Sequence, residues 1–240
     1  MYEPRTYRHW IKDKDLVSFN AVVKETDLCI RAQSNLKEVA VKAIKKHRKP
    51  LEAYIASHPL FLHSLEPYPV EADAPAIIKN MANAAQIARV GPMAAVAGAL
   101  AEAVGKDLLA YSQEVIIENG GDIFMKSLKK RIIGIYAGDS PFTGTIALQI
   151  EAEDTPLGIC TSSGTVGPSL SLGAADAVIT LAHSAALADA AATAVGNRIM
   201  SAADIDVEIG QAGGRYGLSG LVIIKDDRIG LWGNVKLASQ

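Results

Sequence analysis

Residues 177–197 read AVITLAHSAALADAAATAVGN, and the fold class depends on how this stretch relates to its surroundings. The apolar run Ala177–Leu181 predicts a strand. The alanine-rich segment from Ser184 to Asn197 predicts a helix, with Ser184 as its N-cap and Gly196–Asn197 at its C-terminal end. If strands and helices alternate along the rest of the chain, the fold is of the α/β class. If strands are grouped with strands and helices with helices, it is of the α+β class.

The elements on either side are grouped. Further strands are predicted at Arg5–Trp10, Leu16–Val23, Leu28–Ala32, Val115–Glu118, Ile123–Met125, Arg131–Tyr136, Thr145–Ile150, Leu157–Thr161, Ile205–Ile209, Leu221–Ile224 and Ile229–Trp232. The other predicted helices begin at Ser34 or Asn35, at Ala74–Pro75 and at Gly91–Pro92. Because strands and helices do not alternate, the sequence predicts the α+β class, with mostly antiparallel sheets and packed helices.

Length and composition limit the classes of protein that remain. The chain has 240 residues, which predicts a single domain over residues 1–240 built from two similar halves. Two cysteines far apart in sequence, and a polar N-terminal stretch without a signal peptide, predict a reduced, cytoplasmic protein. The most apolar long stretch, residues 174–195, contains Asp176, His183 and Asp189, so no membrane span is predicted.

Charge gives little support for a nucleic-acid partner. The net charge is −2, and the basic stretch at residues 42–49 is typical of the solvated face of a helix. A nucleic-acid patch is the alternative interpretation of that stretch. We therefore expect a small-molecule ligand and no nucleic acid or membrane partner.

The late helix carries a candidate metal site. Asp189 and Thr193 are four residues apart, which places a carboxylate and a hydroxyl on one helix face, one turn apart. These hard oxygen ligands suit Mg²⁺ held beside substrate phosphates. The alternative is a polar patch on an alanine-rich helix that binds nothing.

Two glycine-containing segments are candidates for a ligand pocket. The residues Asn119, Gly120, Gly121 and Asp122 lie between two predicted strands, where paired glycines permit positive φ and close approach to a ligand. The residues Thr161, Ser162, Ser163, Gly164 and Thr165 begin a loop whose hydroxyls and N–H groups can form an anion-binding nest. The alternatives are an ordinary hairpin turn and a flexible surface loop.

Other candidates are weaker. Arg215 could hold a phosphate in the turn Gly213–Gly217, and Asp204, Asp206 and Glu208 share one face of a predicted strand. A hydrolase could use Cys160, Ser162 or Ser163 with His183, but the sequence contains no nucleophile elbow. No catalytic residue is therefore assigned.

Four pieces, taken in order, resemble the ApbE-like flavin-transferase superfamily. They are Gly91-Pro-Met-Ala, Asn119-Gly-Gly-Asp122, Thr161-Ser-Ser-Gly164 and Ala188-Asp-Ala-Ala-Ala-Thr193. The chain is most similar to a compact, uncharacterised branch of that superfamily. The resemblance implies a T-fold-like α+β core and a homodimer. It also implies that Asp189 and Thr193 hold Mg²⁺, and that the Asn119–Asp122 turn and the Thr161–Thr165 loop line a pocket for FAD or FMN.

Two departures from the transferase pattern keep the reaction open. Ala95 stands where the transferases usually carry Lys, and Val166–Ala177 replaces their His-x-x-Asp-Pro segment. An exported lipoprotein leader is not expected either. Three hypotheses follow: a Mg²⁺-dependent enzyme that transfers a flavin or nucleotidyl group, a flavin-binding module without turnover, and a thiol- or sulfur-handling protein that uses Cys160.

Overall fold

The structure, a computed structural model, describes residues 8, 15–166, 171–212 and 215–240. Its elements in chain order are β1 (Val17–Val23), β2 (Thr26–Ala32), α1 (Lys37–Ser57), α2 (Pro59–His63), α3 (Ala76–Ala88), the 3₁₀ turn η2 (Pro92–Ala95), α4 (Val96–Leu108), β3 (Val115–Asn119), β4 (Asp122–Lys126), β5 (Arg131–Gly134), β6 (Ile146–Ile150), the 3₁₀ turn η3 (Ala152–Asp154), β7 (Leu157–Ser162), β8 (Ala177–Ala182), α5 (Ala185–Gly196), α6 (Asp204–Ala212), β9 (Gly220–Lys225), β10 (Arg228–Gly233) and β11 (Leu237–Ser239). The α+β class predicted from the sequence is confirmed.

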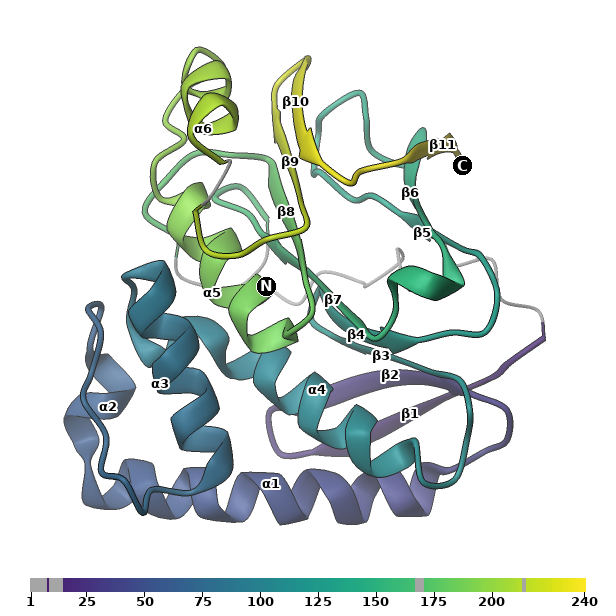
Figure 1. The fold of residues 1–240 in the computed structure, drawn as a ribbon, viewed down its shortest axis with the longest axis vertical. Coiled ribbons are helices and arrows are strands. Elements are labelled where there is room, and N and C mark those ends of the chain that lie inside the picture. The colour runs from purple at the N-terminus through teal and green to yellow at the C-terminus, as the bar shows by residue number, and fades with distance from the viewer. Residues whose placement is uncertain (1–7, 9–14, 167–170, 213–214) are drawn as a thin grey trace.

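The strands form a large and a small sheet. The large sheet has eight strands in the order β1-β2-β3-β4-β7-β8-β9-β10, and the small sheet has three in the order β11-β6-β5. Every strand pair recorded among the described residues is antiparallel. The large sheet lies between the helices and the small sheet (Figure 1), and both of its faces are therefore covered over much of its area.

The two faces of the large sheet build different cores. On the helix side, residues of β2 and β3 such as Ile30 and Ile117 pack with Val104 of α4 and Ala188 of α5. On the other side, Ile116 and other residues of β3, β4, β7, β8 and β9 pack with residues of β5 and β6. The central strands β3, β4, β7, β8 and β9 read as apolar runs without clear alternation because both of their faces are buried.

The helix α5 is buried on nearly every side because its residues are small. Its alanines at positions 185, 186, 188, 190, 191 and 192 have no exposed surface. Alanine favours helix formation and lets neighbouring backbones approach closely. Ser184 caps the helix by accepting a hydrogen bond from the amide of Leu187, as predicted. The alanine run therefore places α5 at the centre of the molecule, against α4, β7 and β8.

Some sequence predictions need correction. Asp204, Asp206 and Glu208 do not share a strand face, because they lie in the helix α6. Buried Ile205, Glu208 and Ala212 repeat at helical spacing, which a short alternating run cannot distinguish from a strand. The predicted strand Arg5–Trp10 lies outside the described residues except for Arg8, and so do Gly213 and Gly214 of the glycine-rich turn.

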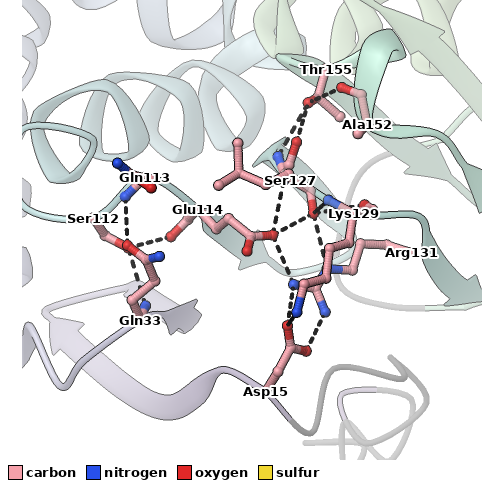
Figure 2. Close-up of polar contacts among 11 residues, drawn as sticks. Asp15, Gln33, Ser112, Gln113, Glu114, Ser127, Lys129, Arg131, Ala152 and Thr155 are labelled. Carbon is pink, nitrogen blue, oxygen red and sulfur yellow. Dashed lines mark hydrogen bonds and ion pairs between the residues drawn. The ribbon is translucent and has the colours of Figure 1, made fainter.

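A buried polar network joins the two sheets to the segment before β1 (Figure 2). Arg131, at the start of β5, donates hydrogen bonds to Asp15 at 2.6 and 3.1 Å and to Glu114 at 2.8 Å. Ser127 donates to the same Glu114 carboxylate at 2.7 Å, and its amide donates to Thr155 Oγ1 at 3.1 Å. The guanidinium therefore balances both carboxylates, and the network fixes the small sheet relative to the large one.

Among the described residues, no single helix has the length and apolar character needed to cross a membrane. The bent pair Ala76–Ala88 and Pro92–Leu108 meets that test only by length and composition.

Candidate functional site

The predicted metal-binding aspartate meets the beginning of another helix. Asp189 Oδ2, on α5, accepts a hydrogen bond at 2.9 Å from the amide of Gly98, in the first turn of α4. A methyl group on Gly98 would lie 2.2 Å from the carbonyl oxygen of Ala185. Only glycine therefore lets α4 come close enough for this hydrogen bond. The positive end of the α4 dipole also favours a carboxylate at this position.

The Asn119–Asp122 turn reaches the same place. Asn119 and Asp122 face each other at the ends of β3 and β4, and Gly120 and Gly121 form the turn with φ of 69° and 108°. The side chain of Asn119 donates a hydrogen bond at 3.1 Å to the carbonyl of Ala97, next to Gly98. Glu118 accepts the Gly121 amide at 2.9 Å from inside the protein. The segment therefore forms a hairpin turn, the alternative interpretation given above, and this turn lies against the N-terminus of α4.

The third predicted piece begins at the end of β7. The amide of Thr161 donates to Asp122 Oδ1 at 3.3 Å, which joins the Thr161–Thr165 loop to the turn. At the other end of α5, a methyl group on Gly196 would lie 3.3 Å from Ser162 Oγ. Asp189, Thr193 and Gly196 share one face of α5 because they are spaced by four and three residues. This face runs from the Asp122 turn to Ser162, with half-buried Thr193 between them.

The rest of the loop is held by its own hydroxyls. Ser163 Oγ accepts the amides of Thr165 at 3.1 Å and Val166 at 3.0 Å. The amide of Gly164 donates to the carbonyl of Ala175 at 2.9 Å, and Thr165 Oγ1 donates to Asp176 Oδ1 at 3.1 Å. The side chains of Ser163 and Thr165 therefore order the loop itself, while residues 167–169 of the predicted segment lie outside the described residues.

The site concentrates negative charge in a desolvated place. Burial, and then the neighbouring charge of Asp189, raises the pKa of Asp122 well above its usual range, although the Thr161 amide opposes the shift. Burial also raises the pKa of Asp189 to about 7, against the opposing hydrogen bonds from Gly98 and Ala97. Among the described residues, neither carboxylate contacts a Lys, Arg or His side chain. Two adjacent aspartates that lack a countercharge can hold a shared proton or a cation.

The side chains at this site are of the chemical type that binds magnesium, but they are few. Within the described ranges, no group of three or more His, Cys, Asp and Glu side chains could hold a metal ion. The chain offers two carboxylates and the Thr193 hydroxyl, which are hard oxygen ligands. Mg²⁺ usually keeps several waters and binds through one or two carboxylates together with substrate phosphates, so this donor set fits it.

Cys160 lies at the base of the site. Its side chain has no exposed surface, and its thiol donates a hydrogen bond at 3.3 Å to the carbonyl of Ala185. Burial, followed by the charges of Asp122 and Asp189, raises the pKa of this thiol well above its usual range. A protonated, enclosed thiol is a poor nucleophile.

A separate cavity of about 230 Å³ opens elsewhere, between the small sheet and the β8–β9 part of the large sheet. Its lining includes Leu157, Leu181, His183 and Lys236, and contains no residue of the predicted metal site, the Asn119–Asp122 turn or the Thr161–Thr165 loop. The register of β7 and β8 pairs Gly158 with Ala182 and Ser162 with Val178, so His183 lies at the opposite end of this strand pair from Ser162 and Ser163, two of the three nucleophiles of the hydrolase interpretation.

Sequence reasoning missed two kinds of supporting residue. Gly98 stands in an ordinary helical run, and only its tertiary contact with Ala185 shows that the position needs glycine. Glu118 and Asp176 are buried carboxylates that fix the turn and the loop through single hydrogen bonds. No spacing in the sequence indicates these contacts, because the residue that each of the three touches lies across a turn or on another element.

Comparisons with known proteins agree on a family. The family model described as AbpE bacteria matches residues 8–213. A UPF0280 protein of Methanocaldococcus jannaschii is 41% identical over 220 residues, which cover 89% of each chain. Another UPF0280 protein, from Methanococcus vannielii, is 44% identical over 194 residues, which cover 79% of this chain and 78% of that protein.

Solved structures with the same fold are flavin transferases. The flavin transferase ApbE from Vibrio cholerae superposes with a TM-score of 0.59 at 13% identity, covering 90% of this chain and 96% of that chain. The flavinyl transferase ApbE from Pseudomonas stutzeri, in its apo form, superposes with a TM-score of 0.56 at 13% identity, covering 90% and 93%. At such identity these structures establish the shared fold.

Proposed function

The chain belongs to the AbpE bacteria family, and on that premise we propose that it binds a flavin nucleotide beside Mg²⁺ and transfers a flavin or nucleotidyl group. The observation that carries the proposal is the meeting of Asp189 and Asp122 at the N-terminus of α4, without a protein cation beside them. Family membership and the fold of the flavin transferases support the choice of a flavin as ligand.

Asp189 and Thr193 would hold the metal ion, with Asp122 next to Asp189. When bound, Mg²⁺ would neutralise charge on the phosphate groups of the ligand. The chain itself would supply the orientation: the Gly98 amide fixes the carboxylate of Asp189, and the Thr161 amide fixes that of Asp122. These hydrogen bonds hold both aspartates in place before a ligand arrives, which reduces the entropic cost of binding.

The turn and the loop would contact the ligand. Asn119, Gly120 and Gly121 expose backbone at a turn with positive φ, where a ligand can approach closely. Thr161, Ser162, Ser163, Gly164 and Thr165 would bind the phosphate-bearing part through N–H and hydroxyl groups. Both segments border the face of α5 that carries Asp189 and Thr193, which supports one pocket.

Isothermal titration of the purified protein with FAD and with FMN, each with and without Mg²⁺, tests the proposal. We expect saturable binding that is stronger with Mg²⁺ and is lost in an Asp189→Asn variant. An Asp73→Asn variant serves as the control. Asp73 is exposed and far from Asp189 in the sequence, so this variant should bind flavin like the wild type. If neither flavin binds under any condition, the proposal is wrong.

A flavin-binding module without turnover is the second candidate. Its support is the sequence: Ala95 replaces the usual Lys, and Val166–Ala177 replaces the His-x-x-Asp-Pro segment of the transferases. Ala95 is fully buried at the end of η2. Its methyl side chain has no polar atom and cannot replace the lysine ammonium. Incubation with FAD, Mg²⁺ and an acceptor polypeptide that offers a threonine hydroxyl separates the two candidates. Only the enzyme transfers FMN to the hydroxyl and releases AMP from FAD.

A further inference from the structure

A buried carboxylate anchors the Thr161–Thr165 loop from behind. Asp176, directly before β8, is only 7% exposed. Its Oδ1 accepts a hydrogen bond from Thr165 Oγ1 at 3.1 Å, and its Oδ2 accepts the amide of Asp226 at 2.6 Å. One side chain therefore connects the loop to the turn between β9 and β10.

The surroundings of Asp176 are themselves held in place. Lys225 Nζ lies 3.8 Å from Asp176 Oδ1 and 2.7 Å from Asp226 Oδ1, so the ammonium balances the buried charge. Ser140 Oγ donates a hydrogen bond at 2.7 Å to the carbonyl of Asp226. The turn between β9 and β10 is thus held by Lys225 and Ser140 as well as by Asp176. Because Asp176 also binds Thr165, it restrains the Thr161–Thr165 loop relative to this fixed turn.

The loop also has little freedom at its own glycine. A methyl group on Gly164 would lie 2.0 Å from the carbonyl oxygen of Gly173. The carbonyl of Ala175 accepts the amide of Gly164 itself, and Ser163 Oγ accepts the next amide, that of Thr165. Asp176 supplies the connection from the hydroxyl of Thr165 to a different part of the large sheet. Without it, the outer end of the described loop would keep only contacts within its own neighbourhood.

From these contacts we propose that Asp176 is a positioning residue, which pre-orders the Thr161–Thr165 loop for a phosphate-bearing ligand. The proposal rests on the proposed function of that loop. Asp176 would touch no ligand atom, because its side chain is buried behind the loop and both of its oxygens face protein donors. A loop that is already ordered binds more tightly, because less conformational entropy is lost on binding.

An Asp176→Asn variant tests this with little change in volume. The asparagine oxygen can still accept a hydrogen bond from Thr165, but its NH₂ group would face the Asp226 amide, so one of the two connections is lost. We expect FMN, titrated with Mg²⁺, to bind about tenfold more weakly. Asp206→Asn is the matched control. Asp206 is exposed and pairs with Arg228 of β10, so this variant should bind FMN like the wild type.

A double-mutant cycle separates positioning from general damage. If Asp176 acts through Thr165, the Thr165→Val and Asp176→Asn double variant binds FMN no more weakly than Thr165→Val alone. If the two effects multiply, Asp176 does not act through Thr165 and the proposal is wrong. Should Asp176→Asn fail to fold, Asp176→Glu replaces it in the same cycle.

Amide hydrogen exchange in the ligand-free protein tests directly whether Asp176 orders the Thr161–Thr165 loop. We expect the amides of Gly164 and Thr165 to exchange faster in Asp176→Asn than in the wild type, while amides of β3 are unchanged. Unchanged exchange in the loop would overturn the proposal even if flavin binds. Conversely, faster exchange in a protein that binds no flavin would support the ordering role of Asp176 and refute the proposed function.

Discussion

The network around Arg131 and the carboxylate pair of Asp122 and Asp189 both remove negative charge from water, but only the first contains a countercharge. Glu114 and Asp15 share the Arg131 guanidinium (Figure 2). Burial raises the pKa of Glu114, yet the hydrogen bonds from Ser127 and Arg131 outweigh it, and the pKa is lowered overall. At the other site burial dominates, and both aspartate pKa values are raised.

The difference supports a structural role for the first group and the proposed functional role for the second. Buried ion pairs with satisfied hydrogen bonds hold elements together, whereas adjacent like charges cost folding free energy and are typical of functional sites. The two regions should therefore respond oppositely to pH. The folded protein should lose the stabilisation of the Arg131 network in acid, and lose stability at the aspartate pair as pH rises.

Removing the countercharge should have the largest effect. An Arg131→Ala variant leaves Glu114 buried and unpaired, and we expect it to lower the free energy of unfolding by about 3 to 5 kcal/mol. Lys129→Ala is the control, because Lys129 is a mostly exposed partner of Asp15 and should cost less than about 1 kcal/mol. Urea denaturation of both variants makes the measurement. Equal losses would mean that Arg131 does not compensate a buried charge.

Crowding the aspartate site should have the next largest effect. A Gly98→Ala variant forces α4 away from α5, because the added methyl group would lie 2.2 Å from the Ala185 carbonyl oxygen. We expect a loss of about 1 to 3 kcal/mol and weaker flavin binding. Gly210→Ala, in α6, is the matched control, since nothing lies within 4 Å of the added atom. It should gain about 0.5 to 1 kcal/mol in thermal denaturation. A gain for both variants would refute the close packing at Gly98.

Neutralising one member of the pair should stabilise the protein in a pH-dependent way. The pKa of Asp189 is about 7, above the unfolded value of about 3.9, so the folded state binds more protons between these values. Stability is therefore lost as pH rises through this window. Asp189→Asn should be more stable than the wild type by about 1 to 3 kcal/mol at pH 8 and similar to it near pH 4.

The measurement is chemical denaturation of both proteins across this pH range, without added metal ions. Asp73→Asn, at an exposed position, should show no such pH-dependent gain. A gain for Asp189→Asn that does not depend on pH would mean that its carboxylate is not destabilised by burial.

The smallest effect is expected at the Cys160 thiol, which lies near both aspartates and donates a hydrogen bond to the Ala185 carbonyl of α5. Cys160→Ala should change FMN affinity by less than about twofold and cost about 1 kcal/mol of stability, because the thiol acts as a small buried side chain. Flavin titration and thermal denaturation measure both. A large loss of activity or affinity would instead support the thiol-based hypothesis.

The sequence predicted most of the fold because its signals were local. The strand at Ala177–Leu181, the Ser184 cap and the Gly91–Pro92 break each depend on neighbouring residues, and the structure confirms them. No helix was predicted at the position of α2, although Pro59 at its start suits a first helical turn. The strand predicted at Ile205–Ile209 was wrong, because five residues fit either the strand period or the helix period.

The site was predictable only in pieces. The order of Asn119–Asp122, Thr161–Thr165 and Asp189–Thr193 suggested that they meet, and hydrogen bonds and close contacts now join Asp122 to Thr161 and α5 to Ser162. Sequence could not show that Gly98 donates to Asp189, because the two lie 91 positions apart. The assignment of these residues to a metal and a flavin remains a prediction.

Binding of Mn²⁺, a paramagnetic substitute for Mg²⁺, tests the central claim most directly. Electron paramagnetic resonance measures free Mn²⁺ during a titration of the protein in the presence of FMN. We expect about one bound ion per chain in the wild type, loss of that binding in Asp189→Asn, and displacement by excess Mg²⁺. Equal Mn²⁺ binding by the wild type and Asp189→Asn, or none by either, would show that the uncompensated carboxylates are not a metal site.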